Sequence, residues 1–383
     1  MTYSVYQHWD PLRVCVVGRS YPPEFYSWIK VPHVRQLFER IAAETEEDFQ
    51  KIVKKLTEFG VEVVRPDLPH TPFVNGQYLP PPMNPRDTTA MIGEKFYHLS
   101  DSTLETFYNS VKDSTWPPTC STAEEFYCLP ASVQQECIEL YGFDFDQDGK
   151  FNIIKPDCFC QIFEKIKKQG NQIVTTQHSC FSGAMVSRIG KDLYFSTESY
   201  NQDQNQLERV INSEFTNTRN HIVNTGGHGD GTYCPVAPGL IISLMDVPTY
   251  ADTFPGWEVV YLPNQSWARV KPFLDLKRKN LGRWWIPGFE YDNDVVEVVE
   301  SWLGHWTGYV EETVFDVNML IVDPKNVIVF NENNRVFSAL HRYGITPHVI
   351  NFRHRYFWDG GIHCVTADLH REGAMQDFFP ERG

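Results

Sequence analysis

VNMLIVDPKNVIVFNENNRVFSALHRYGITPHVINF (Val317–Phe352) decides the fold. Two short runs rich in β-branched residues open it, and each has the length of a strand. A helix is predicted next, because Val336, Phe337 and Leu340 recur at helical spacing. A further apolar run closes the segment, so the predicted order is strand, strand, helix, strand. This order is a supersecondary unit of α/β proteins.

The same pattern recurs elsewhere in the chain. Near the N-terminus we predict a strand at Arg13–Arg19, a helix at Glu44–Gly60 and another strand at Gly60–Asp67. In the second half, the strand PGLIISL (Pro238–Leu244) leads to the strand GWEVVYLP (Gly256–Pro263). Repetition at wide spacing predicts similar α/β modules around an axis. Because each module needs neighbours to cover its sheet, we expect one repeat-built domain over residues 1–383.

Two segments interrupt this pattern. Residues 112–170 are rich in cysteine and polar residues, and residues 276–310 contain four tryptophans around an acidic patch. We interpret both segments as insertions on the module set. Insertions of this kind often cover the mouth of an active site.

Composition narrows the classes of partner and the cellular location. The chain has 34 basic and 49 acidic residues, a net charge of −15, and no basic stripe, so a nucleic-acid partner is not expected. No apolar run reaches the ~20 residues of a membrane span, and the N-terminus lacks a signal-peptide pattern. The nine cysteines are scattered along the length, which is typical of reduced thiols. We therefore expect a cytoplasmic protein with no membrane partner.

Metal binding is also not expected. The sequence has neither the Cys-x2-Cys pair nor the nearby paired histidines of a structural zinc site. The segment Asp144–Asn152 places Asp144, Asp146, Asp148 and Gly149 as in the first half of a calcium-binding EF-hand loop. The position that should hold a bidentate glutamate is Lys155, so an acidic turn is the favoured interpretation.

Three glycine-flanked or proline-flanked segments hold residues that can do chemistry. In GGIHCVTADLHREG (Gly360–Gly373), Cys364 could be a packed thiol, a metal ligand or a nucleophile. In TGGHGDGTYCP, an extended backbone would point His228 and Asp230 to one face as an acid/base pair, and the alternative is a surface loop. In NPRDTTAMIG, Asp87 and its neighbouring arginine precede a strand, and a salt-bridged turn is the alternative.

Together these segments favour a cysteine enzyme that acts on guanidines. A nucleophilic cysteine needs a neighbouring base, and His228 can be that base. Carboxylates at Asp87 and Asp230 suit a planar guanidinium, whose paired N–H groups match a carboxylate.

At this point the ordered motifs resemble the glycine amidinotransferase family of the pentein superfamily. The resemblance covers most of the chain apart from residues 112–170 and 276–310. It is carried by HWDPLRVCVVGRS (His8–Ser20), GVEVVRPD (Gly60–Asp67), NPRD (Asn84–Asp87), TTQHSCFSGAMVSRIGKDLYF (Thr175–Phe195), HGD (His228–Asp230) and the Cys364 segment.

The resemblance implies a fold, a reaction and a set of site residues. The fold would be a pentein α/β propeller of five ββαβ modules. Cys364 would be the nucleophile and His228 the general acid/base, while Asp87 and Asp230 hold the guanidinium. The expected reaction is ping-pong transfer of an amidino group from arginine or a related guanidine to an amine, through an amidino-cysteine. No cofactor is expected, the partners are the small-molecule guanidine donor and amine acceptor, and a homodimer is a possible assembly.

Three positions depart from the family pattern. Ser182 stands where the family has an acid that orients the histidine, and a serine cannot stabilise imidazolium by charge. Val247 stands where the family has an arginine for the substrate carboxylate, and Asp316 replaces a small hydroxyl residue. We count Ser182 and Asp316 among the substrate-binding residues and expect an altered substrate. A hydrolase of the same superfamily and a binding protein that has lost catalysis are the competing interpretations.

Overall fold

Five three-stranded sheets in the described part of the chain share one strand pattern. In each sheet the first strand pairs antiparallel with the second, and the second pairs parallel with the third. A helix lies between the second and third strands of each sheet. The computed structural model describes residues 2–69, 73–74, 77–99, 143–145, 151–153, 158–176, 182–197, 204–225, 228–244, 250–262, 286, 288–289, 292–303 and 316–382.

The sheets and their helices have the following bounds. One sheet joins both ends of the chain: β19 (Thr366–Arg371), β1 (Leu12–Val17) and β2 (Glu62–Val64), with α1 (Pro32–Glu58). The next contains β5 (Thr89–Ile92), β6 (Lys95–Leu99), α6 (Cys160–Lys168) and β9 (Gln172–Thr176). The third contains β10 (Val186–Ile189), β11 (Asp192–Ser196), α7 (Gln204–Glu214) and β12 (Arg219–Val223). The fourth contains β13 (Tyr233–Ala237), β14 (Leu240–Ser243), α8 (Tyr250–Thr253) and β15 (Glu258–Tyr261). The fifth contains β16 (Leu320–Asp323), β17 (Asn326–Val329), α11 (Asn334–Arg342) and β18 (Thr346–Val349).

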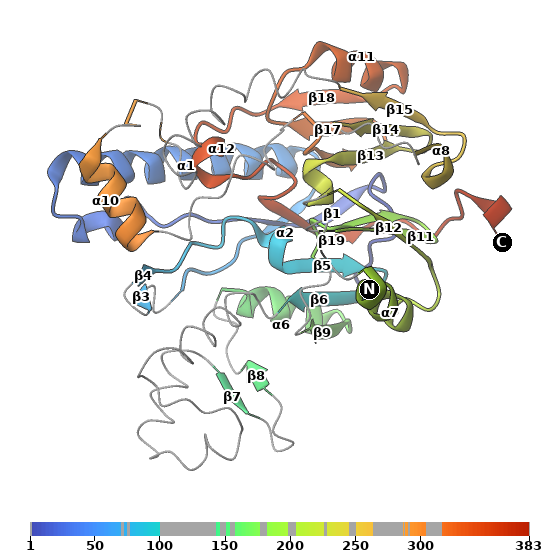
Figure 1. The fold of residues 1–383 in the computed structure, drawn as a ribbon, viewed down its shortest axis with the longest axis horizontal. Coiled ribbons are helices and arrows are strands. Elements are labelled where there is room, and N and C mark those ends of the chain that lie inside the picture. The colour runs from blue at the N-terminus through green and yellow to red at the C-terminus, as the bar shows by residue number, and fades with distance from the viewer. Residues whose placement is uncertain are drawn as a thin grey trace.

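The remaining elements are two short strand pairs and several short helices. Two strand pairs stand apart from them: β3 (Phe73–Val74) with β4 (Gln77–Tyr78), and β7 (Phe143–Phe145) with β8 (Phe151–Ile153). The remaining helical elements are η1 (Pro23–Trp28), α2 (Pro85–Thr88), η2 (Gly229–Gly231), α10 (Asn293–Trp302), α12 (Arg355–Trp358) and η4 (Pro380–Arg382). In Figure 1, α11, α7 and α6 lie outside the sheets, whereas β1 and β19 lie near the middle.

The strand–strand–helix–strand prediction for Val317–Phe352 is confirmed by β16, β17, α11 and β18. The helix predicted at Glu44–Gly60 is wrong at its start, because α1 begins at Pro32. Proline is favoured in the first turn of a helix, where its missing N–H has no partner to lose. The apolar stripe also continues upstream through buried Leu37, Phe38 and Ile41. Gly60, at φ +74°, takes the left-handed conformation just past the end of the helix.

Parts of the two supposed insertions belong to the packed body. Ile162 and Ile166 of α6 are buried against Phe96 of β6, so the end of segment 112–170 supplies the helix of the second sheet. In segment 276–310, Val295 and Val299 of α10 join the same core cluster as α1. The segment Asp144–Asn152, interpreted above as an acidic turn, lies outside the described residues apart from the backbone of β7 and β8.

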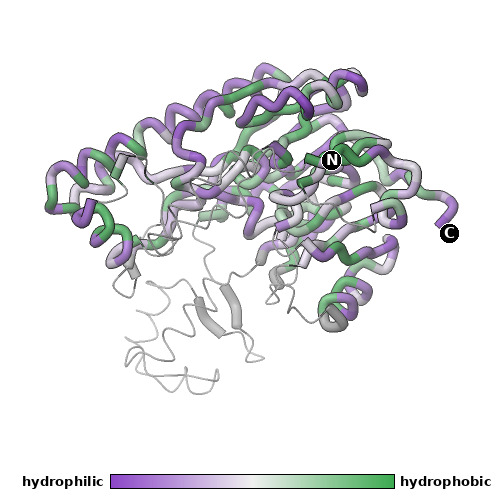
Figure 2. The backbone as a smooth tube through the Cα atoms, turned by 45° about the horizontal axis from the view of Figure 1, so that its top comes forward, coloured by the Kyte–Doolittle hydropathy of each residue, from purple (hydrophilic) through white to green (hydrophobic). Residues whose placement is uncertain are grey.

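The cores lie between neighbouring sheets and under their helices. One cluster combines buried side chains of β13 and β14 with those of β16, β17 and α11. Another combines β5 and β6 with β10, β11 and α7. Figure 2 shows hydrophobic stretches gathered among the central strands and hydrophilic stretches mainly on the outside. None of the described helices combines the length and the apolar character that a membrane crossing requires.

Candidate active site

Cys364 lies in a buried turn immediately before β19, held by Asn318. The Asn318 side-chain oxygen accepts the backbone N–H of His363 at 2.8 Å, and its amide nitrogen lies 3.0 Å from the Cys364 sulfur. Gly361 permits this approach, since a Cβ at that position would lie 2.1 Å from Asn318 Oδ1. Asn318 carries no local signal in the sequence, because a position preceding a strand does not reveal a contact with a residue 46 positions away.

Asp230 lies beside both His363 and Cys364. Its Oδ2 is 2.7 Å from His363 Nδ1 and 3.6 Å from the Cys364 sulfur. Its Oδ1 is buried and has no hydrogen-bond partner among the described residues. The site therefore presents an open carboxylate oxygen next to a thiol.

The extended backbone considered for His228–Asp230 is wrong, since η2 forms a turn there. Gly229 packs so closely on β11 that a Cβ would lie 2.0 Å from Ser196 Oγ. The Asp230 N–H donates to Ala184 O at 3.1 Å, which fixes the turn against the segment before β10. As a result Asp230 pairs with His363 rather than with His228.

Electrostatics keep the Asp230–His363 pair as carboxylate and neutral imidazole. Burial alone would raise the pKa of Asp230, but the hydrogen bond from His363 and the positive charge of Arg86 lower it overall. Burial and the Arg86 charge lower the pKa of His363 to about 4. At neutral pH the Nδ1–H of neutral His363 donates to ionised Asp230.

The two polar residues of NPRD separate in α2. Arg86 is buried and donates from Nε to the carbonyls of His363 at 2.7 Å and Thr366 at 2.9 Å. Asp87 faces the site instead, with Oδ1 4.0 Å from His228 Nδ1. The alternative interpretation of a salt bridge within the turn is wrong, since Arg86 pairs with Asp368 at 2.9 Å.

Two of the three positions that depart from the family pattern, Ser182 and Asp316, lie among the described residues. Ser182 is buried, and its hydroxyl has no hydrogen-bond partner among the described residues. The Ser182 carbonyl accepts the N–H of Met185 in the turn that leads to β10. Two residues further on, the Ala184 carbonyl accepts the backbone N–H of Asp230. Asp316 is buried two residues before Asn318. Val247 lies outside the described residues.

Replacing Asn318 by aspartate (Asn318→Asp) is expected to slow alkylation of Cys364 by iodoacetamide at neutral pH by about tenfold. Aspartate keeps an acceptor for the backbone N–H groups of the turn. Aspartate lacks the N–H that donates to the sulfur, and a hydrogen bond to a charged acceptor contributes about 1.5–3 kcal/mol of stabilisation. The new carboxylate also repels the thiolate. The measurement is the alkylation rate at Cys364, followed by peptide mass mapping.

The matched control is Asn333→Asp at the N-cap of α11, where aspartate also accepts the capping N–H groups. Its alkylation rate should equal that of the wild type. An Asn318→Asp rate equal to or above wild type would contradict a stabilising contact between the amide and the thiolate.

Comparison with known proteins places this geometry in context. Mitochondrial glycine amidinotransferase of Xenopus tropicalis is 23% identical over 413 residues, covering 98% of this chain and 84% of that protein. Inosamine-phosphate amidinotransferase 1 of Streptomyces glaucescens is 22% identical over 403 residues, covering 98% of each chain. The chain is thus similar to amidinotransferases over nearly its whole length. No protein-family model matches the sequence.

The fold of the chain is also found in a solved structure. SxtG, an amidinotransferase from Microseira wollei, has a TM-score of 0.61 at 17% identity, covering 98% of this chain and 99% of that one. The predicted resemblance to the glycine amidinotransferases of the pentein superfamily is confirmed. The small three-stranded sheets are consistent with the pentein fold.

Proposed function

We propose that the protein transfers an amidino group from a guanidine donor, such as arginine, to an amine acceptor through a covalent intermediate on Cys364. The observation that carries this proposal is the Cys364 sulfur 3.6 Å from Asp230, a buried carboxylate with an open oxygen. The full-length similarity to amidinotransferases supports the same reaction class.

Asp230 and Asp87 would bind the guanidinium of the donor. Asp230 Oδ1 can accept one N–H of a planar guanidinium, while Oδ2 stays with His363. Asp87, whose Oδ1 lies 4.0 Å from His228 Nδ1, can accept further N–H groups. Because Asp230 Oδ2 is within 3.6 Å of the thiol, a guanidinium bound there has its central carbon beside the sulfur.

The reaction then proceeds in two displacements. The Cys364 thiolate forms a C–S bond with the guanidino carbon, and the C–N bond to the donor amine breaks as His228 protonates that amine. The acceptor amine next attacks the amidino carbon and gives a proton to His228. The C–S bond breaks, and its electron pair returns to sulfur as the thiolate.

Asn318 and Arg86 support these steps without taking part in bond exchange. The Asn318 amide donates toward the sulfur and stabilises its negative charge. Arg86 fixes the carbonyls of His363 and Thr366 on either side of the nucleophile. The turn therefore holds Cys364 in one place through both half-reactions.

Product analysis tests the proposed function. The protein is incubated with arginine alone and with arginine plus a panel of amines, and products are identified by mass spectrometry. The proposal expects ornithine together with a new guanidino compound that appears only when an amine is present. Citrulline, or ornithine with urea, formed equally without the amine would instead indicate a hydrolase.

Replacing Asp87 by asparagine (Asp87→Asn) is expected to lower kcat/KM for the guanidine donor by about 100-fold or more. The amide keeps the shape but removes the charge that pairs with the guanidinium, and losing one partner of a desolvated charge pair costs about 2–5 kcal/mol. Steady-state kinetics with arginine measures the change. Glu208→Gln, at an exposed acid on α7, is the control expected to match wild type. An unchanged kcat/KM for Asp87→Asn would remove Asp87 from the substrate site.

We also propose that the five sheets form a closed ring, as in a five-module propeller. Several contacts support a circular order. β19 contacts β5, β10 contacts β13, and β16 contacts β1. Arg188 of β10 donates to the carbonyl of Met91 in β5, and one core cluster joins β13 with β16. Pairing of β19 with β1 would then close the ring at the two ends of the chain.

The acceptor, the location and the assembly are open to experiment. The replacement of the family arginine by Val247 leads us to propose an acceptor or donor other than a standard α-amino acid bound through its carboxylate. We propose a cytoplasmic location because Cys15 and Cys234 are free, buried thiols, which are typical of proteins in a reducing compartment. A homodimer is proposed as well, and light scattering measures it directly.

A further inference from the structure

A cavity lies at the ends of β5 and β10, away from the thiol site. It has a volume of about 600 Å³, within the range of small-molecule pockets. Gly93 and Gly190, in the turns after β5 and β10, line it. Asp87 of the thiol site precedes β5 and Gly93 of the cavity follows it, so the four residues of that strand, about 13 Å, separate these two residues.

The walls of this cavity are held together by backbone hydrogen bonds. Val5 and Gly93 exchange two backbone hydrogen bonds of 2.9 Å, and the N–H of Gly190 donates to Tyr6 O at 3.0 Å. The N-terminal segment is thereby fixed to two neighbouring sheets. A cavity with walls fixed in this way is present before any ligand arrives.

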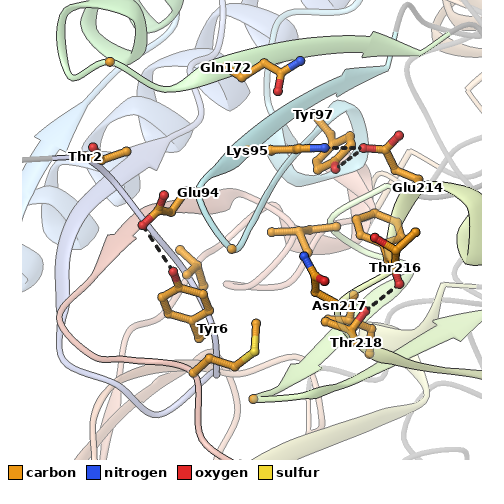
Figure 3. Close-up of a pocket in the computed structure, with 18 residues that line it drawn as sticks. Thr2, Tyr6, Glu94, Lys95, Tyr97, Gln172, Glu214, Thr216, Asn217 and Thr218 are labelled. Atoms are coloured by element: carbon orange, nitrogen blue, oxygen red, sulfur yellow. Dashed lines mark hydrogen bonds and ion pairs between the residues drawn. The ribbon is translucent and has the colours of Figure 1, made fainter.

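Opposite charges face each other across the cavity. Figure 3 shows Tyr6 and Glu94 on one side and Lys95 with Glu214 on the other. Glu94 accepts the Tyr6 hydroxyl at 3.4 Å through Oε1, which leaves its second oxygen available. Lys95 donates to Glu214 at 3.0 Å, so two of the three N–H donors of its ammonium group remain.

Glu214 is engaged by two neighbours on its own side of the cavity. Its Oε1 already accepts Tyr97 OH at 2.7 Å as well as Lys95. Burial alone would raise the pKa of Glu214, but the hydrogen bonds from Tyr97 and Lys95 lower it overall. Glu214 therefore stays ionised and holds the Lys95 ammonium at the cavity wall.

Between the charged sides the lining includes apolar side chains beside polar ones such as Gln172 and Asn217. Val5, Ile92 and Leu193 are buried side chains of the lining, and Met375 on the rim is 37% exposed. An apolar side chain of a ligand that packs against this part of the lining is itself removed from water.

We propose that this cavity binds a free α-amino acid with an apolar side chain. Its carboxylate would pair with Lys95 and its ammonium with Glu94, and its side chain would lie on the apolar lining. A simple amine or a simple carboxylic acid can use only one of the two charged sides. The proposal does not depend on amidino transfer at Cys364.

Isothermal titration with L-leucine tests the proposal on the full chain. The matched probes are 3-methylbutylamine and 4-methylpentanoate, each of which lacks one charged group of leucine. We expect leucine to bind with a stoichiometry of one. Each matched probe should bind about tenfold to a hundredfold more weakly, as expected for the loss of a charge-assisted contact. No binding of leucine, or equal binding of either probe, would overturn the proposal.

Variants locate the binding. Glu94→Gln and Lys95→Met should each weaken leucine binding at least about tenfold. Lys191→Met is the matched control, because Lys191 is similarly exposed and also pairs with a carboxylate, Asp377, at 3.2 Å. It should bind leucine like the wild type. Thermal unfolding confirms that each variant is folded.

The Asp87→Asn variant distinguishes leucine binding in the cavity from leucine binding at the thiol site. Leucine affinity should not change in this variant if leucine binds in the cavity. Loss of leucine binding in Asp87→Asn, or retention in both Glu94→Gln and Lys95→Met, would place the ligand elsewhere and overturn the proposal.

Discussion

Replacing Cys364 by alanine (Cys364→Ala) is expected to lower the rate of amidino transfer by roughly 10⁶-fold, the order found when a covalent nucleophile is removed. The thiol is the atom that bonds to the guanidino carbon, and neither Asn318 nor Asp230 can replace it. Release of ornithine from arginine in the presence of an amine measures the rate. Substrate binding should persist, because Asp230 and Asp87 remain.

Other cysteines provide the controls for this experiment. Cys158→Ala and Cys160→Ala, at the start of α6, should keep full activity. Burial raises the pKa of Cys15 and Cys234 to about 12, so these thiols stay protonated at neutral pH and are poor nucleophiles. If Cys364→Ala kept full activity, the assignment of the nucleophile would be wrong.

Replacing Asp368 by asparagine (Asp368→Asn) is expected to lower the free energy of unfolding by about 3–5 kcal/mol, the cost of removing one partner of a buried ion pair. Asp368 is buried and pairs with Arg86 at 2.9 Å, Arg188 at 2.8 Å and Arg371 at 2.7 Å. Burial lowers the pKa of Arg188 to about 10, so its guanidinium stays charged at neutral pH. Without the carboxylate, three buried cations would face one another.

Chemical denaturation measures this loss, and Asp192→Asn is the comparison. Asp192 is also buried, but its partners Arg219 and Arg382 keep 18% and 16% of their side chains exposed. Because water can reach these cations, the loss of stability should be smaller. An Asp368→Asn variant as stable as the wild type would contradict the role given to the cluster.

The same carboxylate predicts a dependence of stability on pH. Burial alone would raise the pKa of Asp368, but the three arginines outweigh burial and hold it well below its ordinary value. A depressed folded-state pKa gives stability that is fully present above the unfolded-state pKa of about 4 and is lost as pH falls below it. In Asp368→Asn this part of the acid dependence should disappear.

Local patterns in the sequence predicted the modules well. Residues 317–352 carry their own strand and helix spacing, and each element forms where its apolar residues indicate. The start of α1 was missed because only the second half of its apolar stripe was used. The helix α6 was hidden within a cysteine-rich segment, although Ile162, Phe163 and Ile166 have helical spacing.

The site was less accessible to sequence reasoning, because its contacts join distant segments. Asn318, Asp230 and His363 come from three different parts of the chain and meet within hydrogen-bond distance. The pairing of Asp230 with His363 depends on the turn at Gly229, whose close approach to Ser196 no local pattern reveals. The sequence left open that Arg86 forms a salt-bridged turn, but Arg86 is buried and donates to the His363 carbonyl of the cysteine turn.

Trapping of the covalent intermediate tests the central claim most directly. The protein is incubated with arginine without an amine acceptor, quenched in acid and digested. The mass of each cysteine-containing peptide is then measured by mass spectrometry. We predict that the peptide containing Cys364 gains the mass of one amidino group in place of the thiol hydrogen, and that adding an amine removes this adduct. Absence of the adduct across a broad panel of guanidines, or an adduct on another cysteine, would contradict amidino transfer through Cys364.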